Sequence, residues 1–236
     1  FSPSGWGSSA ASSGAPHYIV LPSAKEYIYI KGGPHEGTTI ARSVDGNVYD
    51  VKNDRETNFK ADFDKGLTVE FWLKKDELVT TPTQASETIF DLWNGYERDS
   101  ADSFRLNISI PNEGGTSSFR VSCIKGAQGA TTGFNFASSD GEITSWTASQ
   151  LNDSAWHHYA FEISNEGTAL QLNFYVDGVF QQRITKASAA ISSVDNATMV
   201  ATIGAMIAHH PSIGAYGTIA SPNHQGASKL SGSIDE

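Results

Sequence analysis

The sequence has one cysteine, few basic residues and no long apolar run. Because Cys123 is alone among 236 residues, no disulfide can form within the chain, and the fold must be stabilised by burial. Lys and Arg number 16 against 26 Asp and Glu, which argues against a surface for duplex nucleic acid, since such surfaces need clustered cations. No apolar stretch approaches the ~20 residues of a membrane-spanning helix, and the start of the chain lacks the charged and apolar regions of a signal peptide.

The chain is instead rich in period-two alternation of apolar and polar side chains. Residues 156–163 and 170–176 alternate in this way, as strands of a half-buried antiparallel pair do. Asp177 and Gly178 then form a tight-turn dipeptide that predicts a return strand over residues 180–184. Further alternating runs lie at residues 67–73, 88–93, 104–110 and 119–124. With no competing helical period, the pattern predicts an all-β, two-sheet antiparallel sandwich with Cys123 in its core.

Other segments predict shorter or less regular structure. Residues 17–21 and 26–30 are expected to form a first strand pair, and residues 48–51 a short strand after the turn signal at Asp45, Gly46 and Asn47. The insertions at 127–151 and 187–199 are expected to be loops or extra edge strands, and 204–226 an irregular loop.

Four short motifs support a more specific fold. They are GLTVEFWLK at 66–74, WHHYA with LQLNFYVDG at 156–160 and 170–178, ATIG at 201–204, and LSGSIDE at 230–236. In this order they resemble the laminin-G-like, concanavalin A-like lectin/glucanase jelly-roll superfamily. The resemblance implies a jelly-roll sandwich and says much less about a ligand.

The domain organisation is expected to be simple. Residues 1–16, rich in Ser, Gly and Ala, have the composition of a flexible arm or linker. Residues 17–236 are expected to form a single laminin-G-like jelly-roll domain with a truncated closing strand. The chain is therefore expected to be a segment of a longer polypeptide.

Catalytic residues are not expected. Retaining glycosidases of this jelly roll place their carboxylates in an E-x-D-x-x-E run, which brings two of them ~5 Å apart. The sequence contains no such run, so we predict that the protein is not an enzyme and rank a glycoside hydrolase last among the functions considered.

Histidines offer a weak case for a metal site. His157 and His158 are adjacent, so on a strand they point to opposite faces and cannot chelate one ion. His209, His210 and His224 share one loop, but no Cys or carboxylate completes a zinc spacing. Structural or surface roles are the simpler interpretation for all of them.

Calcium is the cofactor that the resemblance suggests, because family members often carry such an ion at one rim. Asp235 of the IDE motif would contribute by resemblance, with Asp45 and Asn47 as oxygen donors from an early turn. The competing interpretation is that these residues form only a turn and a strand-end hydrogen-bond acceptor.

A sugar site needs an aromatic platform and amide or acidic groups for the hydroxyls. The cluster of Trp93, Asn94 and Tyr96 has this mixture, and Tyr216 is a further candidate in the Gly-rich loop. Trp146 also falls off the core pattern, in a polar loop. Each aromatic could equally be a local packing anchor.

The sequence therefore favours a non-catalytic binding or adhesion module that recognises a glycan or glycoprotein surface, within an extracellular or virion-surface protein. The alternative is a structural component of a phage or virus particle, in which the sandwich contacts neighbouring subunits. The arm at residues 1–16 would distinguish them, since docking of the arm on a neighbour favours assembly.

Overall fold

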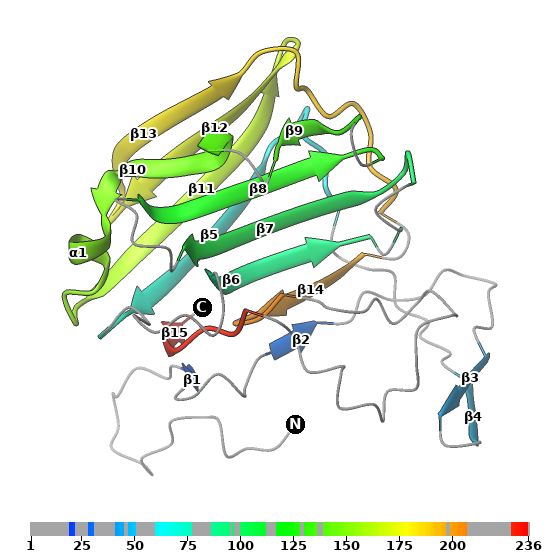
Figure 1. Cartoon of the computed structure of the whole chain (residues 1–236), viewed down its shortest axis with the longest axis horizontal. Helices are drawn as coiled ribbons and strands as arrows, with labels where there is room; N and C mark the ends of the chain where they lie inside the picture. The colour runs from blue at the N-terminus through cyan, green and yellow to red at the C-terminus, as the bar shows by residue number, and fades with distance from the viewer. Residues whose placement is uncertain are drawn as a thin grey trace.

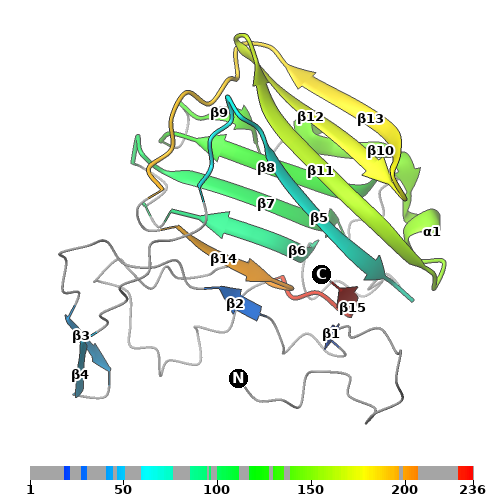
Figure 2. The same ribbon diagram turned by 180° about the vertical axis from the view of Figure 1, so that it is seen from behind.

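The computed structural model describes the backbone of short strands at 19–21, 28–30, 41–44 and 47–50. It then describes residues 60–76, 86–94, 96, 100–111, 117–127, 130–135, 139–196, 199–206 and 228–235. Two antiparallel sheets lie face to face: Figure 1 shows β6, β7 and β8 in front of β5 and β11, and Figure 2 shows the reverse. The two-sheet sandwich predicted from the alternation is confirmed. The arm at 1–16 lies outside the described residues.

One sheet has six strands. In spatial order they are β1 (Ile19–Leu21), β15 (Gly232–Asp235), β5 (Leu67–Lys74), β11 (Trp156–Glu166), β12 (Ala169–Val176) and β13 (Val179–Lys186). The predicted meander of β11, β12 and β13 is confirmed. Asp177 and Gly178 both have positive φ, 51° and 76°, which suits the tight turns that match strand twist.

The other sheet has seven strands. Their order is β10 (Glu142–Thr147), β8 (Ser117–Lys125), β7 (Phe104–Pro111), β6 (Ser86–Trp93), β14 (Val200–Ile203) and β2 (Ile28–Ile30), with β9 (Thr132–Phe134) also paired to β8. A 3₁₀ turn (Ser139–Gly141) and a helical turn, α1 (Ala148–Leu151), flank β10. A separate hairpin joins β3 (Ala41–Val44) to β4 (Asn47–Asp50).

Two expectations need correction. The first two strands do not pair with each other: β1 pairs with β15 and β2 with β14, in different sheets. Local sequence marks a strand but does not choose its partner, because pairing depends on strands distant in the chain. Trp146 lies on β10 and packs against the core, not in a loop. The 127–151 insertion thus supplies extra strands, whereas the described residues 187–196 form a loop.

The core lies between the sheets and is strongly aromatic. Phe161 is fully buried, and its ring lies 5.0 Å from Phe174, 5.4 Å from Phe119 and 5.9 Å from Phe71. Burial of each such side chain contributes about 1.5–3 kcal/mol relative to exposure. Cys123 is fully buried in this core, as predicted, and burial raises the pKa of its thiol.

A buried ion pair joins the two sheets at one end. Lys75 follows β5, Glu87 lies on β6, and their side chains are 1% and 0% exposed. The ammonium contacts both carboxylate oxygens, at 3.1 and 2.9 Å, and donates to the Ser231 carbonyl. The Ser231 N–H donates to Glu87 in turn, so this pair fixes the entry to β15. No helix in the described part of the chain is long and apolar enough to span a membrane.

Candidate functional site

The turn after β6 brings Trp93, Asn94 and Tyr96 together at one rim. The Trp93 indole N–H donates to the Tyr96 carbonyl at 3.1 Å, and the Tyr96 hydroxyl donates to Asp195 at 2.8 Å. That hydrogen bond to a carboxylate raises the pKa of Tyr96. The Arg105 guanidinium carbon lies 5.1 Å from the Trp93 ring centroid, so a cation already contacts this indole.

Asn94 is buried and organises this turn. Its amide N–H groups donate to the carbonyls of Asp102 and Asp195, at 2.8 and 3.3 Å, and its oxygen accepts the Phe104 N–H at 3.0 Å. These contacts are with backbone groups of the chain itself. Asn94 therefore has a structural role, and Trp93 and Tyr96 are the members of the trio that reach the surface.

The other predicted ligand residues do not converge in the described structure. Tyr216 and Asp45 lie outside the described residues, and of Asn47 only the backbone, in β4, is described. The histidines of the Gly-rich loop are also outside them. Asp235 lies on β15 beside Trp72 of β5. Among the described side chains, no three His, Cys, Asp or Glu residues converge on a metal position, so the calcium site stays a prediction.

The described surface most suited to a ligand was missed from the sequence. It is the outer side of the six-stranded sheet around Trp72, called here the Trp72 face. Trp72 is a large hydrophobic residue with 40% of its surface exposed. The strand register places it between Asp235 on β15 and His158 on β11. These residues lie far apart in the sequence and meet only through strand pairing.

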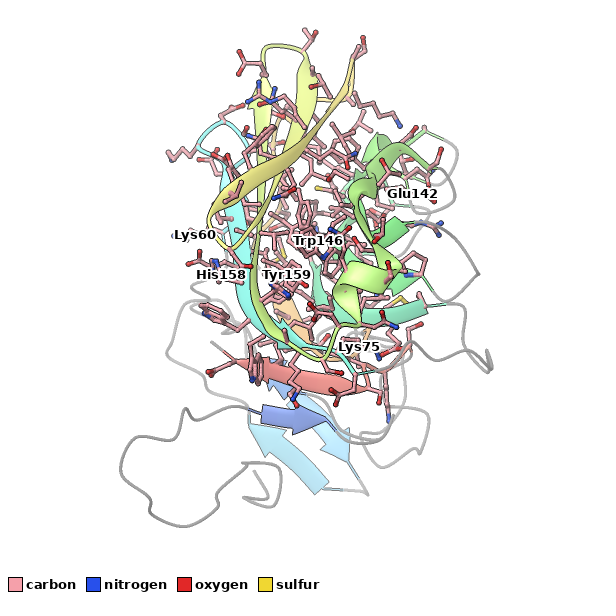
Figure 3. The ribbon with its side chains drawn as sticks, turned by 90° about the vertical axis from the view of Figure 1, so that its left-hand side faces the viewer. Lys60, Lys75, Glu142, Trp146, His158 and Tyr159 are labelled. Atoms are coloured by element: carbon pink, nitrogen blue, oxygen red, sulfur yellow. The ribbon has the colours of Figure 1, made fainter. Side chains whose placement is uncertain are left out.

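The neighbours of Trp72 are polar and ionisable. The His158 ring lies 5.3 Å from the indole, and its Nε2 lies 3.7 Å from a carboxylate oxygen of Glu70. Figure 3 shows His158 on the outer side of the six-stranded sheet, whereas Tyr159 lies between the sheets. Adjacent residues of β11 thus point to opposite sides of the sheet, one to the surface and one to the core. This agrees with the prediction that His157 and His158 point to opposite faces.

The same outer surface continues onto β12 and β13. Tyr175 and Phe180 are register partners with ring centroids 5.6 Å apart, and Phe180 is 49% exposed. Next to them, Glu162 accepts from Asn173 at 3.0 Å, and the Asn173 oxygen accepts from Arg183 at 2.9 Å. The surface therefore interleaves aromatic rings with charged and amide groups that are held in place by one another.

A sequence signal for this face did exist. Trp72 occupies the polar phase of β5, together with Thr68, Glu70 and Lys74. An aromatic residue in the solvent-facing phase of a strand indicates a surface role. The importance of Trp72 could not be judged from the sequence, because the polar residues that surround it in the candidate site come from β11 and β15.

His157, on the inner side of β11, forms an electrostatic cluster. Its Nδ1 lies 2.7 Å from Asp177 and its Nε2 lies 3.1 Å from Asp153. Burial lowers the pKa of His157, but hydrogen bonds to the two carboxylates outweigh it, so the pKa is raised. Both ring nitrogens can donate at once only in the imidazolium form. The cluster clamps the β12–β13 turn against β11.

The carboxylates on β6 do not form a hydrolytic pair. Glu87 and Asp91 are both 0% exposed, and each is paired with a cation, Lys75 and Arg105 respectively. An acid and a nucleophile for glycoside hydrolysis must both reach the scissile bond. Glu87 and Asp91 therefore have structural roles, as buried partners of Lys75 and Arg105.

The comparisons with known proteins agree with the fold. A laminin G family model described as the concanavalin A-like lectin/glucanases superfamily matches residues 45–236. No curated protein matches the chain significantly.

Three solved structures illustrate the range of similar proteins. The CBM40 domain of a Ruminococcus gnavus sialidase, bound to α2,3-sialyllactose, is 13% identical over 71% of this chain and 71% of its own, with a TM-score of 0.38. The LG1–3 region of the laminin α2 chain is 13% identical over 74% of this chain and 28% of its own, with a TM-score of 0.37. A β-porphyranase of Bacteroides plebeius is 10% identical over 88% and 73%, with a TM-score of 0.36.

These structural likenesses are too weak to carry a conclusion about function, and both binding domains and an enzyme are among them. The family model is the stronger finding, because it covers most of the chain. It agrees with the order of motifs in the sequence and with the two-sheet sandwich. The chain belongs to the concanavalin A-like lectin/glucanases superfamily.

Proposed function

We propose that the protein is a non-catalytic carbohydrate-binding module that binds a glycan on the Trp72 face. The observation that carries the proposal is the exposed indole of Trp72, flanked in the strand register by Asp235 and His158. An indole stacks on the apolar face of a sugar ring, while carboxylate and imidazole groups bond to its hydroxyls. A binding domain of this kind suits the surface of a cell or particle.

The charges around Trp72 favour a neutral glycan. Glu70 is 62% exposed, and Asp235 lies on the other side of the indole. The whole chain carries a formal charge of −10. Carboxylates repel the sulfate and carboxylate groups of anionic sugars, so neutral or amino sugars should bind better.

The test is a glycan array followed by titration of the best ligand, with and without calcium. Trp72→Ala should weaken binding by about 30-fold or more, the loss expected for a central aromatic contact. Phe180→Ala is the matched control, because it removes an exposed aromatic residue from the same sheet but from β13, which β11 and β12 separate from β5. It should weaken binding far less than Trp72→Ala. Calcium dependence would support the ion site predicted with Asp235.

The rim offers a competing location for the same activity. If Trp93→Ala or Tyr96→Phe abolishes binding while Trp72→Ala does not, the glycan binds at the rim and the Trp72 assignment is wrong. Failure of all glycans to bind would reject the proposed function.

A structural role in a larger particle is the second candidate. The observation that favours it is the exposure of Val179 and Phe180, 60% and 49%, on the edge strand β13. Exposed apolar residues on an edge strand are typical contacts between chains. A defined oligomer that Phe180→Asp dissociates, together with no glycan binding, would favour this role.

A further inference from the structure

Ala160 lies in the middle of the outer face of the six-stranded sheet, on the same side of β11 as His158 (Figure 3). It is partly exposed, and the strand register places it between Glu70 on β5 and Tyr175 on β12. Glu162, two residues along β11, shares this face. Because Ala160 ends in a methyl group, the longer side chains around it stand higher above the sheet. They can therefore surround a small group that rests on Ala160.

Two aromatic side chains border this position. Trp72 is opposite His158 in the register, which makes it a diagonal neighbour of Ala160, and such neighbours are about 7–8 Å apart. Tyr175 is held by Phe180, whose ring meets it edge-on with the centroids 5.6 Å apart. The faces of such aromatic rings attract cations. The aromatic border therefore favours a positively charged group over an uncharged one of equal size.

Glu162 is held in place through one of its two oxygens. Its Oε2 accepts from the Asn173 amide at 3.0 Å and from the Tyr175 hydroxyl at 3.3 Å. Asn173 is only 6% exposed, and Arg183 donates to its oxygen at 2.9 Å. Burial and the Glu162 carboxylate raise the pKa of Tyr175, so its hydroxyl stays protonated and donates. The Glu162 Oε1 accepts no hydrogen bond from a described residue and can accept one from a ligand.

Glu70 supplies a second carboxylate. It is 62% exposed, and its described ionisable contact is His158, at 3.7 Å. The ion pairs of Lys and Arg in the described part of the chain are all with other acids. Glu70 and Glu162 are diagonal neighbours across β5 and β11, so their side chains can reach one group between them. Two carboxylates are too few for Ca²⁺, which takes about six to eight oxygen ligands, but they match an ammonium with its three N–H donors.

We propose that the Trp72 face selects an amino sugar, whose ring stacks on Trp72 and whose protonated amine lies over Ala160. Glu162 and Glu70 accept hydrogen bonds from that amine. This selection rests on the proposed glycan binding at Trp72 and specifies the class of sugar. Charge-assisted hydrogen bonds are about twice as strong as neutral ones. A hydroxyl in place of the amine lacks the charge, and an N-acetyl group lacks it and is larger.

Three β-1,4-linked tetrasaccharides test this selection by isothermal titration of the full chain. They consist of glucosamine, N-acetylglucosamine or glucose, and so differ only in the group at carbon 2. At about pH 6.5, an amine with a pKa of about 8 is protonated. The glucosamine tetramer should bind about tenfold more tightly than the other two. This advantage should shrink at about 1 M salt, where the screening length is about 3 Å.

Glu162→Gln locates the amine. Glutamine keeps an oxygen for the Asn173 and Tyr175 donors but has no charge. The advantage of the glucosamine tetramer should therefore fall to about twofold or less, while binding of the glucose tetramer, which also reports that the variant is folded, stays the same. Glu166→Gln is the matched control, because Glu166 is an exposed acid on the same face of β11, about 13 Å further along. It should leave the advantage within about twofold of the wild-type value.

The outcomes separate the amine site from glycan binding itself. Equal binding of the three tetramers, tighter binding of an uncharged one, or an advantage that survives Glu162→Gln would overturn the amine site. Binding of other glycans at Trp72 without binding of the glucosamine tetramer would also overturn it. In these cases a loss of binding in Trp72→Ala would still support the glycan site. Absence of binding to every glycan would reject both proposals.

Discussion

Replacement of Lys75 by Met should strongly destabilise the protein. The Lys75 ammonium is 1% exposed and contacts both carboxylate oxygens of Glu87, which is 0% exposed. Without it, the Glu87 carboxyl group stays inside the sandwich without its cation, with the Ser231 N–H as its described donor. Breaking a buried pair in this way costs about 3–5 kcal/mol. At about 2–4 °C per kcal/mol for a chain of this size, the unfolding midpoint should fall by roughly 6–20 °C.

The double variant tests the reason for that loss. Lys75→Met with Glu87→Leu removes both charges and fills the space with apolar groups, which is often neutral or stabilising for a buried pair. The Ser231 carbonyl and N–H then lose their partners, at about 1–3 kcal/mol. The double variant should therefore be more stable than Lys75→Met alone.

Urea unfolding followed by tryptophan fluorescence measures all three proteins. The expected order of unfolding free energy is wild type, then the double variant, then Lys75→Met. If Lys75→Met lowers the unfolding free energy by less than about 1 kcal/mol, the reasoning is wrong. It is also wrong if the double variant is no more stable than Lys75→Met, because the loss would then not come from leaving Glu87 buried without its cation.

Three further predictions concern the inner side of the sandwich. Because the pKa of His157 is raised above 6.5 and those of Asp153 and Asp177 are lowered below 3.8, their cluster stabilises most between these values. The His157 contribution is lost as pH rises through its folded pKa, so His157→Gln should flatten the fall in unfolding midpoint between about pH 6 and 8; an unchanged profile would contradict this. Gly133→Ala should destabilise by more than 1 kcal/mol in urea unfolding, since φ is 99° and a Cβ would lie within 1.9 Å of the Cys123 carbonyl. Finally, burial raises the pKa of Cys123, so native protein should react with a thiol reagent only after unfolding, and rapid labelling of folded chain would refute that.

Much of the fold was predictable because strand alternation is a local property. The two-residue turn at 167–168 and the dipeptide Asp177–Gly178 connect alternating runs by links too short for anything but hairpins. The order β11, β12, β13 follows directly. The pairing of the first two strands was not predictable in this way. β1 and β2 are close in sequence, yet each joins a different sheet.

The candidate site was only partly predictable for the same reason. The residues of the rim trio are sequence neighbours, so their proximity was evident, but the burial of Asn94 depends on Phe104 and Asp195, which reach it from other segments. The alternation at residues 67–73 puts Trp72 in the polar phase of β5. Its importance depends on His158 and Asp235, which only the strand register places beside it.

The sequence by itself determined most of the strands, the inward and outward phase of their side chains, and the family, because periodicity and short motifs are local properties of the chain. Tertiary structure alone decided how strands distant in the sequence pair, that Lys75 and Glu87 meet inside the sandwich, and that Trp72 lies between Asp235 and His158. Those features arise where segments distant in sequence meet. Local propensity contains no information about which distant segment becomes the neighbour.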